Sequence, residues 1–339
     1  MIFKVIKIKG FLYALIILMA IGAFLGVNPK LKNASSQKKD FIKWVDFKVT
    51  ENALNDCYNA DVSAYKDGKK LDWIECLAYL GARYGGDFSR YKKKDLTEFS
   101  EKILKGEKAE NICSDLKYYK YYKEAYGAIL GEFVGEYEIE TVDENNLRKI
   151  EKKYGLKVFS PIARGYHYAH YDDFGSSRSY GYKRKHLGHD LMGSVGTPIV
   201  AVESGIVEAL GWNRYGGWRI GIRSFDKKRY YYYAHLRRGH PYSDEIYEGK
   251  TVTAGEVIGY LGMTGYSIKE DVNNINTPHL HYGLQLIFDE SQKEGNGEIW
   301  IDMYAITNFL EKNKSVVEKN YENGEFYRKY QMFEEVTID

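Results

Sequence analysis

The sequence predicts an α+β protein in which a small all-α domain precedes an antiparallel β-sheet domain of the sandwich type. Three patterns indicate this fold class. Residues 10–27 form an apolar run without a charge, residues 41–137 repeat apolar side chains at helical spacing, and short β-like segments separated by glycine-rich turns begin at residue 199. A chain of 339 residues, 44% of them hydrophobic, is long enough to build two folded units.

The N-terminal segment carries a membrane signal. Residues 1–9 contain three lysines and precede the apolar run 10–27, which approaches the roughly 17–25 residues that a membrane-spanning helix needs. The basic flank predicts that residues 1–9 stay in the cytoplasm. A cleaved signal peptide is the alternative, but no A-x-A site follows the run, so a retained transmembrane anchor is favoured. Both interpretations place the rest of the chain outside the cytoplasm.

A helical domain is predicted after a polar linker. Residues 28–39 are polar and indicate the linker, and residues 40–140 form the expected helical domain. Trp73, Leu77 and Leu80 illustrate its apolar spacing. Solvated helix faces explain its isolated carboxylates better than a second active site does, because glycosidase chemistry needs paired carboxyl groups in defined environments.

A charged, helix-prone connector over 141–156 leads into the β domain, which is expected over 157–312. A charged tail over 313–339 is predicted to be helical or partly disordered. Within the β domain, alternating and β-branched residues predict a series of short strands and a final helix. The strands are Ile206–Trp212, Arg219–Arg223, Arg229–Leu236, Val257–Leu261 and His281–Ile287, and the helix is Trp300–Lys312.

Charge and cysteine content add two limits. The net charge is +2 and lysine and arginine alternate with aspartate and glutamate, so nucleic acid is not an expected partner. Cys57, Cys76 and Cys113 all lie in the predicted helical domain, away from the histidines of the β domain. They allow either one disulfide and one free thiol or three reduced thiols.

Four residues of the β domain have the spacing of a metal site. His186 and Asp190 are four residues apart, and His279 and His281 are two apart, so each pair falls on one face of an extended strand. Two imidazoles and one carboxylate leave the fourth position of a tetrahedral zinc open, as in catalytic sites. The spacing therefore predicts one zinc ion that is available for chemistry.

Three short motifs carry a resemblance to a known family. They are His186-Leu-Gly-His-Asp190, Tyr233-Ala-His235-Leu236 and Pro278-His279-Leu280-His281. In this order they resemble the H-x-x-x-D motif, the lone histidine in a tyrosine-containing strand and the H-x-H motif of the lysostaphin and LytM-like zinc endopeptidases. The turn Gly262-Met-Thr-Gly265 matches as well, and the resemblance covers about residues 158–310.

The resemblance implies a role for each motif residue. His186, Asp190 and His281 would hold one zinc ion per chain. His235 and His279 would stand beside the metal and the scissile carbonyl, one as general base and the other as a stabiliser of the oxyanion or proton donor to the leaving amine. Which histidine does which is left open.

Other candidates near the motifs are weaker. Tyr180 would donate to the oxyanion by resemblance, although it could equally line the groove. His189 has strand parity opposite to that of His186 and should point away from the metal. The segment 166–173, with two histidines and two carboxylates, is interpreted as a groove wall and not as a second metal site. Residues 269–276 are inserted relative to the family pattern and should lengthen another groove wall.

The resemblance also implies function and location. The expected protein is an exported zinc metallo-endopeptidase that hydrolyses stem or cross-bridge peptides of bacterial peptidoglycan. It would be a single-pass protein of the cell membrane, anchored through residues 10–27, with its bulk facing the cell wall and a regulatory protein as a candidate partner of the helical domain. The alternative is a membrane-anchored scaffold, or a sporulation-channel-type protein, that uses the same domain to bind a partner.

Overall fold

The structure is a computed structural model that describes residues 41–179 and 183–334. By contacts the chain divides into residues 1–41 and one compact unit, residues 42–339. The predicted cytoplasmic segment 1–9, anchor 10–27 and linker 28–39 lie outside the described residues. Within the described part, no helix combines the length and apolarity that crossing a membrane requires.

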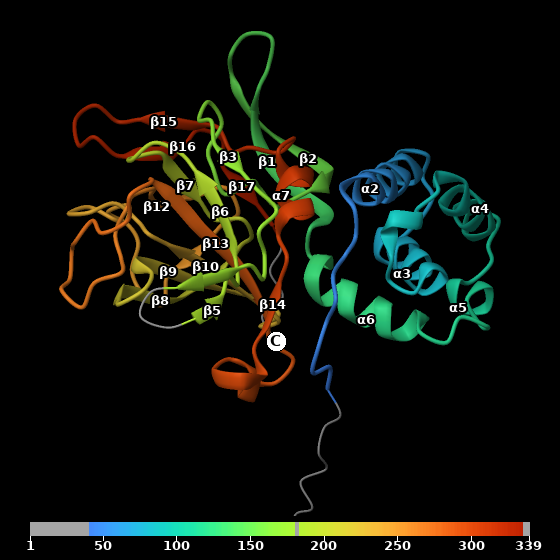
Figure 1. The fold of residues 1–339 in the computed structure, drawn as a ribbon. Coiled ribbons are helices and arrows are strands. Elements are labelled where there is room, and N and C mark those ends of the chain that lie inside the picture. Colours follow the sequence, from blue (N-terminus) through green and yellow to red (C-terminus); the bar gives the residue numbers. More distant parts are fainter. Residues whose placement is uncertain (1–40, 180–182, 335–339) are drawn as a thin grey trace, which may run out of the picture. The chain divides into compact units, whose positions relative to one another are not determined.

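The helical part has the character predicted from the sequence (Figure 1). Thr50 and Asp72 accept backbone N–H groups at the starts of the helices Glu51–Lys66 and Trp73–Tyr84, and Gly85 ends the latter helix in the left-handed conformation. The elements are α2 (Glu51–Lys66), α3 (Trp73–Tyr84), η1 (Phe88–Arg90), α4 (Lys93–Leu104), α5 (Ala109–Ile112) and α6 (Tyr119–Leu130).

The predicted helical connector is wrong, because this region is a β-hairpin. Strands β1 (Val134–Val142) and β2 (Arg148–Leu156) pair antiparallel over their whole length. The charges that suggested a helix pair across the strands instead: Arg148 contacts Glu140 at 3.0 Å and Lys152 contacts Glu136 at 2.5 Å. Cross-strand pairing thus overrides the local helix preference of these residues.

The β domain is built on one eight-stranded antiparallel sheet of order β11-β8-β9-β10-β13-β6-β3, with β14 paired to β13. All five strands predicted from the sequence are present. Of the sandwich predicted from the sequence, the structure contains this one large sheet and a two-stranded sheet formed by β7 and β12. The bounds are β3 (Ala169–His170), β6 (His189–Met192), β7 (Pro198–Val200), β8 (Gly205–Asn213), β9 (Gly217–Ser224), β10 (Arg229–Ala234), β11 (Thr251–Val252), β12 (Val257–Tyr260), β13 (His279–Leu286) and β14 (Ile299–Ile301).

The C-terminal region differs from the sequence prediction in two ways. Trp300 belongs to β14, so the expected helix is confined to α7 (Tyr304–Leu310). The tail is neither helical nor disordered over its described length, because Phe326 and Met332 pack on a small apolar cluster around Phe159. Its strands are β15 (Val317–Lys319), β16 (Phe326–Arg328) and β17 (Met332–Phe333), of which β17 pairs with β1.

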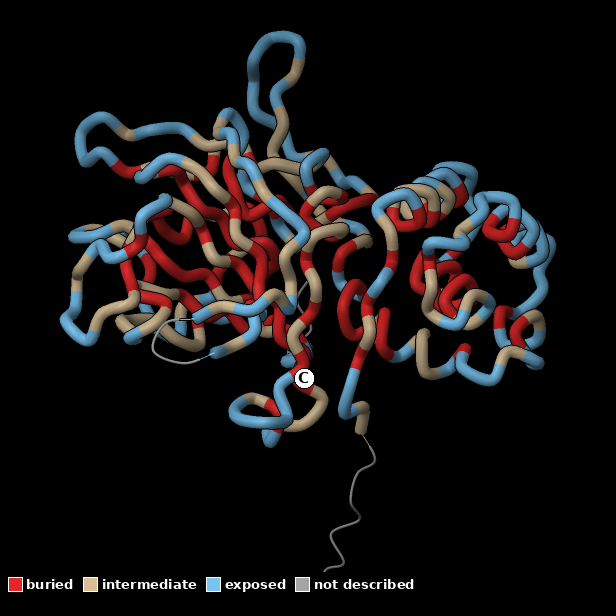
Figure 2. The backbone as a smooth tube through the Cα atoms, viewed as in Figure 1, coloured by how far each residue is buried: buried red, intermediate tan, exposed pale blue. Residues whose placement is uncertain are grey.

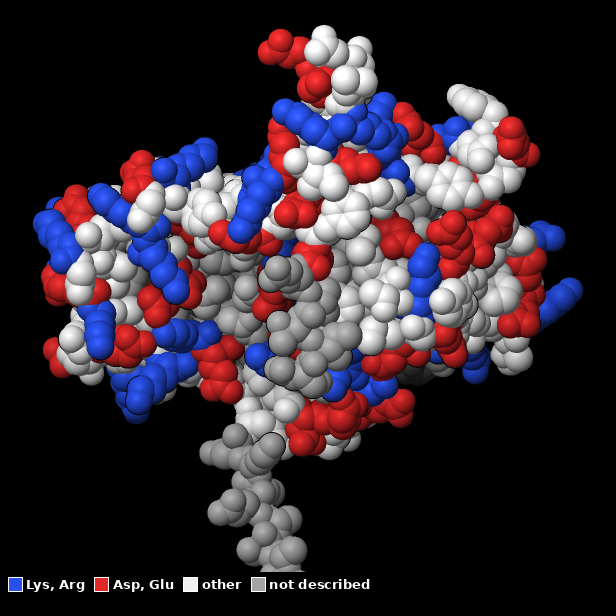
Figure 3. Space-filling view, turned by 180° about the vertical axis from the view of Figure 1, so that it is seen from behind, with Lys and Arg blue, Asp and Glu red and all other residues white. Residues whose placement is uncertain are grey.

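The helical and β parts share one hydrophobic core, and Figure 2 shows buried residues in both parts. Arg229 of β10 is completely buried, pairs with Glu203 and donates to the carbonyl oxygen of Ala128 in α6 at 2.7 Å. The cysteines Cys57, Cys76 and Cys113 are buried in the helical part and none is in a disulfide. On the face shown in Figure 3, basic and acidic side chains are interspersed.

Candidate metal centre and substrate groove

Two neighbouring strands bring three of the predicted site residues together. In the antiparallel pair of β6 and β13, His281 lies directly opposite Asp190, and His279 lies opposite Met192. Residues two apart share a strand face, so His279 and His281 project on the same side of the sheet, as predicted from their spacing. The register therefore sets a carboxylate and two imidazoles side by side.

His186 reaches the same place by a different route from the one predicted. It is not on a strand with Asp190, because β5 (Lys183–Lys185) ends before it and β6 begins only at His189. A short bend through Gly188 separates the two strands. A Cβ atom at Gly188 would lie 2.5 Å from Cε1 and Nε2 of His281, so only glycine allows the bend to approach that imidazole.

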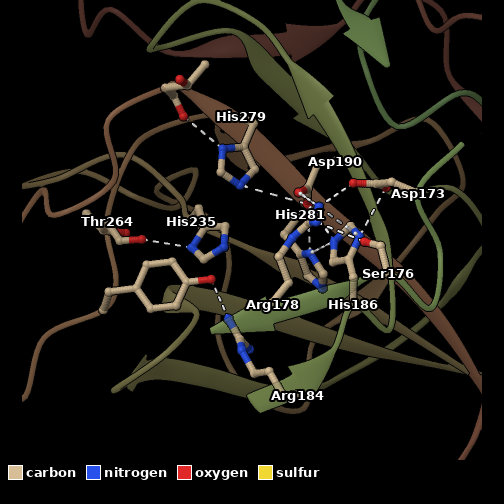
Figure 4. Close-up of polar contacts among 12 residues, drawn as sticks. Asp173, Ser176, Arg178, Arg184, His186, Asp190, His235, Thr264, His279 and His281 are labelled. Carbon is tan, nitrogen blue, oxygen red and sulfur yellow. Dashed lines mark hydrogen bonds and ion pairs between the residues drawn. The ribbon is translucent and has the colours of Figure 1, made fainter. Parts of the chain in front are cut away.

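Three ligand atoms converge (Figure 4). His186 Nε2 lies 3.0 Å from Asp190 Oδ1, His281 Nδ1 lies 2.9 Å from the same oxygen, and the two nitrogens are 3.2 Å apart. Tetrahedral zinc with bonds of about 2.0–2.1 Å places its ligand atoms about 3.3 Å apart. The nitrogen and oxygen set, and its spacing, therefore fit a zinc ion held from three sides.

The charge state of this cluster suits a cation. Burial would raise the pKa of Asp190, but hydrogen bonds from His186 and His281 outweigh burial and hold the pKa well below its usual range. Burial lowers the pKa of His281, and its hydrogen bond with Asp190 offsets this only in part. The carboxylate is therefore charged and the neutral form of His281 is favoured, as metal binding requires. Burial would lower the pKa of His186, but its hydrogen bond with Asp190 and the charge of that carboxylate outweigh burial and raise it, so His186 would release a proton when a cation binds.

A second carboxylate orients His186. Asp173 Oδ1 lies 3.1 Å from His186 Nδ1 and accepts its proton, so that a cation would bind at Nε2 in place of the proton shared with Asp190. Arg178, on β4 (Ser177–Ser179), donates to Asp173 and to Ser176 and lies 3.7 Å from the outer oxygen of Asp190. Neither Asp173 nor Arg178 was predicted from the sequence as a site residue. The one signal in the sequence was that Asp173 lies next to a loop rich in glycine and serine.

His235 follows β10 in a strained conformation. Its φ angle is 62°, in the left-handed region that residues with a Cβ rarely adopt. The backbone N–H of His235 donates to Gly216 at 2.7 Å, and its side-chain Nδ1 donates to the carbonyl oxygen of Thr264 at 2.9 Å. Thr264 belongs to the Gly262–Gly265 turn noted in the sequence, which explains what that turn contributes to the site.

His279 is oriented in the same manner. Its Nδ1 donates to the carbonyl oxygen of Thr277 at 2.8 Å, so its Nε2 carries the lone pair and lies 3.8 Å from Asp190 Oδ1. The ring centroids of His279 and His235 are 4.8 Å apart. Burial, followed by the nearby His279 and His281, holds the pKa of His235 well below its usual range, so that imidazole is neutral.

The outcome differs among the weaker candidates, which are Tyr180, His189 and the histidines of segment 166–173. Tyr180 lies outside the described residues. His189 is buried on the opposite side of β6, where its Nε2 lies 2.7 Å from Nδ1 of His170, as its strand parity predicted. Among the described residues, neither His170 nor His167 belongs to a group that could hold a metal ion, whereas His186, Asp190 and His281 form one such group.

A groove of about 580 Å³ runs past the histidine cluster. Its walls are rich in tyrosine and arginine. Tyr266, which precedes the inserted residues 269–276, lines the groove, and its ring centroid lies 5.8 Å from that of His235. The inserted residues themselves are not among those that line this groove, so their role in a groove wall stays a prediction. Other lining residues include Arg184, Tyr215, Arg219, Tyr230, Tyr232, Glu298 and Trp300.

Fold and site together define a metallopeptidase-type domain, and comparison with known proteins gives its family. Residues 184–294 match Peptidase family M23. The chain is 40% identical over 124 residues to the L-Ala–D-Glu endopeptidase of Bacillus subtilis and 37% identical over 98 residues to lysostaphin of Staphylococcus staphylolyticus. The region matched to the Bacillus subtilis protein makes up 37% of this chain and 36% of that relative. The region matched to lysostaphin makes up 29% of this chain and 18% of that relative. The match of residues 184–294 to Peptidase family M23 confirms the resemblance to the lysostaphin and LytM-like family.

The fold likeness reaches further than the sequence likeness. A crystal structure of a Ruminococcus gnavus protein designated lytM superposes with a TM-score of 0.51 at 22% identity, covering 81% of this chain and 92% of that one. Residues 157–339 make up little more than half of the chain, so the shared fold includes part of the helical region. At this identity the likeness concerns the fold.

Proposed function

We propose that this chain is an exported, zinc-dependent endopeptidase that hydrolyses peptide bonds in bacterial peptidoglycan. The observation that carries the proposal is the convergence of His186 Nε2, Asp190 Oδ1 and His281 Nδ1 beside two further imidazoles. Support for the substrate comes from the relatives, which are named as L-Ala–D-Glu endopeptidase and lysostaphin. The apolar run 10–27 supports a membrane anchor with the bulk of the chain facing the wall.

In this proposal the metal ligands hold one zinc ion, which supplies a water nucleophile at neutral pH and polarises the scissile carbonyl. The remaining steps fall to the chain itself. His186 and His281 bind through one nitrogen each, and Asp173 keeps His186 in the required tautomer. Asp190 brings one negative charge, which lowers the cost of placing a divalent cation in a half-buried site.

His235 and His279 carry the proton transfers. Both donate Nδ1–H to a backbone carbonyl oxygen, so both direct a basic Nε2 away from the backbone. One accepts the proton from the attacking water, and the other steadies the developing oxyanion or protonates the leaving amine. Fixed tautomers remove the need to reorient either ring during the reaction, which is what a preorganised site requires.

The direct experiment is digestion of purified peptidoglycan by the full chain in detergent, with His281→Ala as its matched control. Muropeptides released are identified by mass. New amine and carboxyl ends from the wild type alone support the proposal and name the bond that is cleaved. Zinc bound in stoichiometric amount without any release by the wild type contradicts it and favours a partner-binding scaffold.

A further inference from the structure

The groove contains two arginines that lack an anionic partner. Among the described residues, neither Arg184 nor Arg219 forms an ion pair with a carboxylate, and the Nε atom of each is buried without a hydrogen-bond partner. Two other arginines, on the same large sheet as Arg219, are paired with carboxylates. Arg223 contacts Glu208 at 2.8 Å, and Arg229 contacts Glu203 at 2.8 Å. The contrast indicates cations left available on the groove side.

Both arginines lie one side chain away from the metal cluster. Arg184 donates to the hydroxyl of Tyr266, whose ring stands beside His235 (Figure 4). Arg219 lines the groove on β9 next to the β10 tyrosines, and the ring centroid of Tyr232 is 6.0 Å from that of His281. A group bound between them would therefore sit beside the reacting peptide bond.

The electrostatics of the tyrosines agree with this placement. Burial raises the pKa of Tyr232, while the charges of Arg219 and Arg184 both act to lower it. Both guanidinium groups are therefore close enough to act electrostatically on the Tyr232 hydroxyl. Burial raises the pKa of Tyr230 to about 12, and the charge of Arg219 again opposes this rise. Both phenols therefore remain neutral donors and leave the two positive charges uncancelled.

Carboxylates in the groove are already engaged or remote. Asp190 belongs to the metal cluster, and Glu298 accepts from the indole nitrogen of Trp300 at 2.7 Å and from the Gly295 N–H at 3.1 Å. Glu294 is exposed. A partly buried guanidinium without a counter-ion is costly, and a planar carboxylate satisfies it through two parallel hydrogen bonds.

We infer that Arg184 and Arg219 form a subsite for a substrate carboxylate on a residue adjoining the scissile bond. The subsite rests on the proposed function and names its substrate class: stem peptides that carry a free carboxylate, such as that of D-glutamate, and not the uncharged glycines of a cross-bridge. Tyrosine hydroxyls beside the two cations add neutral donors to the same anion.

The test uses two synthetic stem peptides that differ only in a D-glutamate α-carboxylate or its carboxamide. For the wild type, kcat/KM should be at least about tenfold higher for the carboxylate peptide, because hydrogen bonds to a charged group are stronger than neutral ones. Arg219→Gln should lower kcat/KM for the carboxylate peptide only and so abolish the preference. Arg219→Lys should keep part of it, since the charge remains but the planar fork is lost.

Control experiments distinguish a failure of the subsite proposal from a failure of the proposed function. Arg164→Gln removes the same charge from an exposed arginine outside the groove lining and should leave the preference intact. Equal cleavage of both peptides by the wild type overturns the subsite while the proposed function stands. No cleavage of either peptide, or of peptidoglycan, overturns the proposed function itself. Zinc content verifies that each variant is folded, and Arg184→Gln gives an independent variant if Arg219→Gln is not.

Discussion

The protonation of four imidazoles and two carboxylates determines what the proposed site can do. His235 and His279 each keep a proton on Nδ1, which donates to a backbone carbonyl oxygen, and His186 Nδ1 donates to Asp173 in the same way. The free nitrogens of His235 and His279 are therefore available for proton transfer. His186 and His281 instead direct nitrogens at the Asp190 oxygen, where a cation fits.

Substitution of each histidine by alanine should separate metal binding from proton transfer. His281→Ala should lose zinc and activity together, because it removes one of three ligands. His279→Ala and His235→Ala should keep most of the zinc and lower kcat by about 10²- to 10⁴-fold, the usual contribution of a general acid or base. Zinc content and turnover are measured on the same preparations. Equal metal loss in all three variants would refute this division of roles.

Asp173 should matter for metal affinity although it does not reach the metal. Asp173→Asn weakens the acceptor that fixes the His186 tautomer, so zinc affinity should fall by about 10- to 100-fold. Competition with a chromophoric chelator measures the change. Asp172→Asn is the matched control, because the neighbouring carboxylate is exposed and forms no contact with His186. An unchanged affinity for Asp173→Asn would mean that the contact is incidental.

The sequence identified the residues that short motifs contain and missed the ones that only the fold brings in. The strand parity of His279, His281 and His189 follows from their positions alone, and the structure agrees with it. Asp173 contacts His186 across thirteen positions and Arg178 reaches Asp190 across twelve. No short-range periodicity encodes such contacts, since they depend on how the β4 and β5 segments fold back.

Strands with an alternating pattern were predictable, whereas charged segments were not. The predicted strands from Ile206 to Ile287 match β8, β9, β10, β12 and β13, because each contributes buried apolar residues to the core. The segment 134–156 has few core residues and many charges, so its local preference favoured a helix. Its strand form depends on pairing of the two arms with each other and with β17, which the local sequence does not reveal.

The bend between β5 and β6 predicts a sensitive glycine. Gly188→Ala would place a Cβ atom 2.5 Å from the His281 ring, so the bend or the ring must move, at a cost of about 1–3 kcal/mol. Zinc affinity should fall because the ring is a ligand in the proposed site. Gly297→Ala is the control, since its nearest neighbours lie at 3.5 Å or more. Calorimetric zinc titration of both variants makes the comparison, and equal affinities would show that the bend tolerates a side chain.

One core joins the helical and β parts, so the two should unfold together. Arg229 ties β10 to α6 through Ala128 and neutralises the buried Glu203. Arg229→Met leaves that carboxylate uncompensated and should lower the free energy of unfolding by about 3–5 kcal/mol. Urea denaturation followed by circular dichroism and by tyrosine and tryptophan fluorescence should show one shared transition.

The matched control for this prediction is Lys94→Met, which removes an exposed ion pair with Glu98 on α4. It should change the free energy of unfolding by less than about 1 kcal/mol. If the helical signal of Arg229→Met survives after the β signal is lost, the helical part is an independent domain, as the sequence alone suggested.

The central claim is that one zinc ion at His186, Asp190 and His281 enables peptide hydrolysis. The most direct test is to remove metal from the full chain with a chelator and titrate zinc back while following hydrolysis of peptidoglycan. Activity should be absent without metal and should rise linearly to a plateau at one zinc per chain. Hydrolysis by the metal-free protein, or binding of one zinc per chain without hydrolysis, would contradict the account.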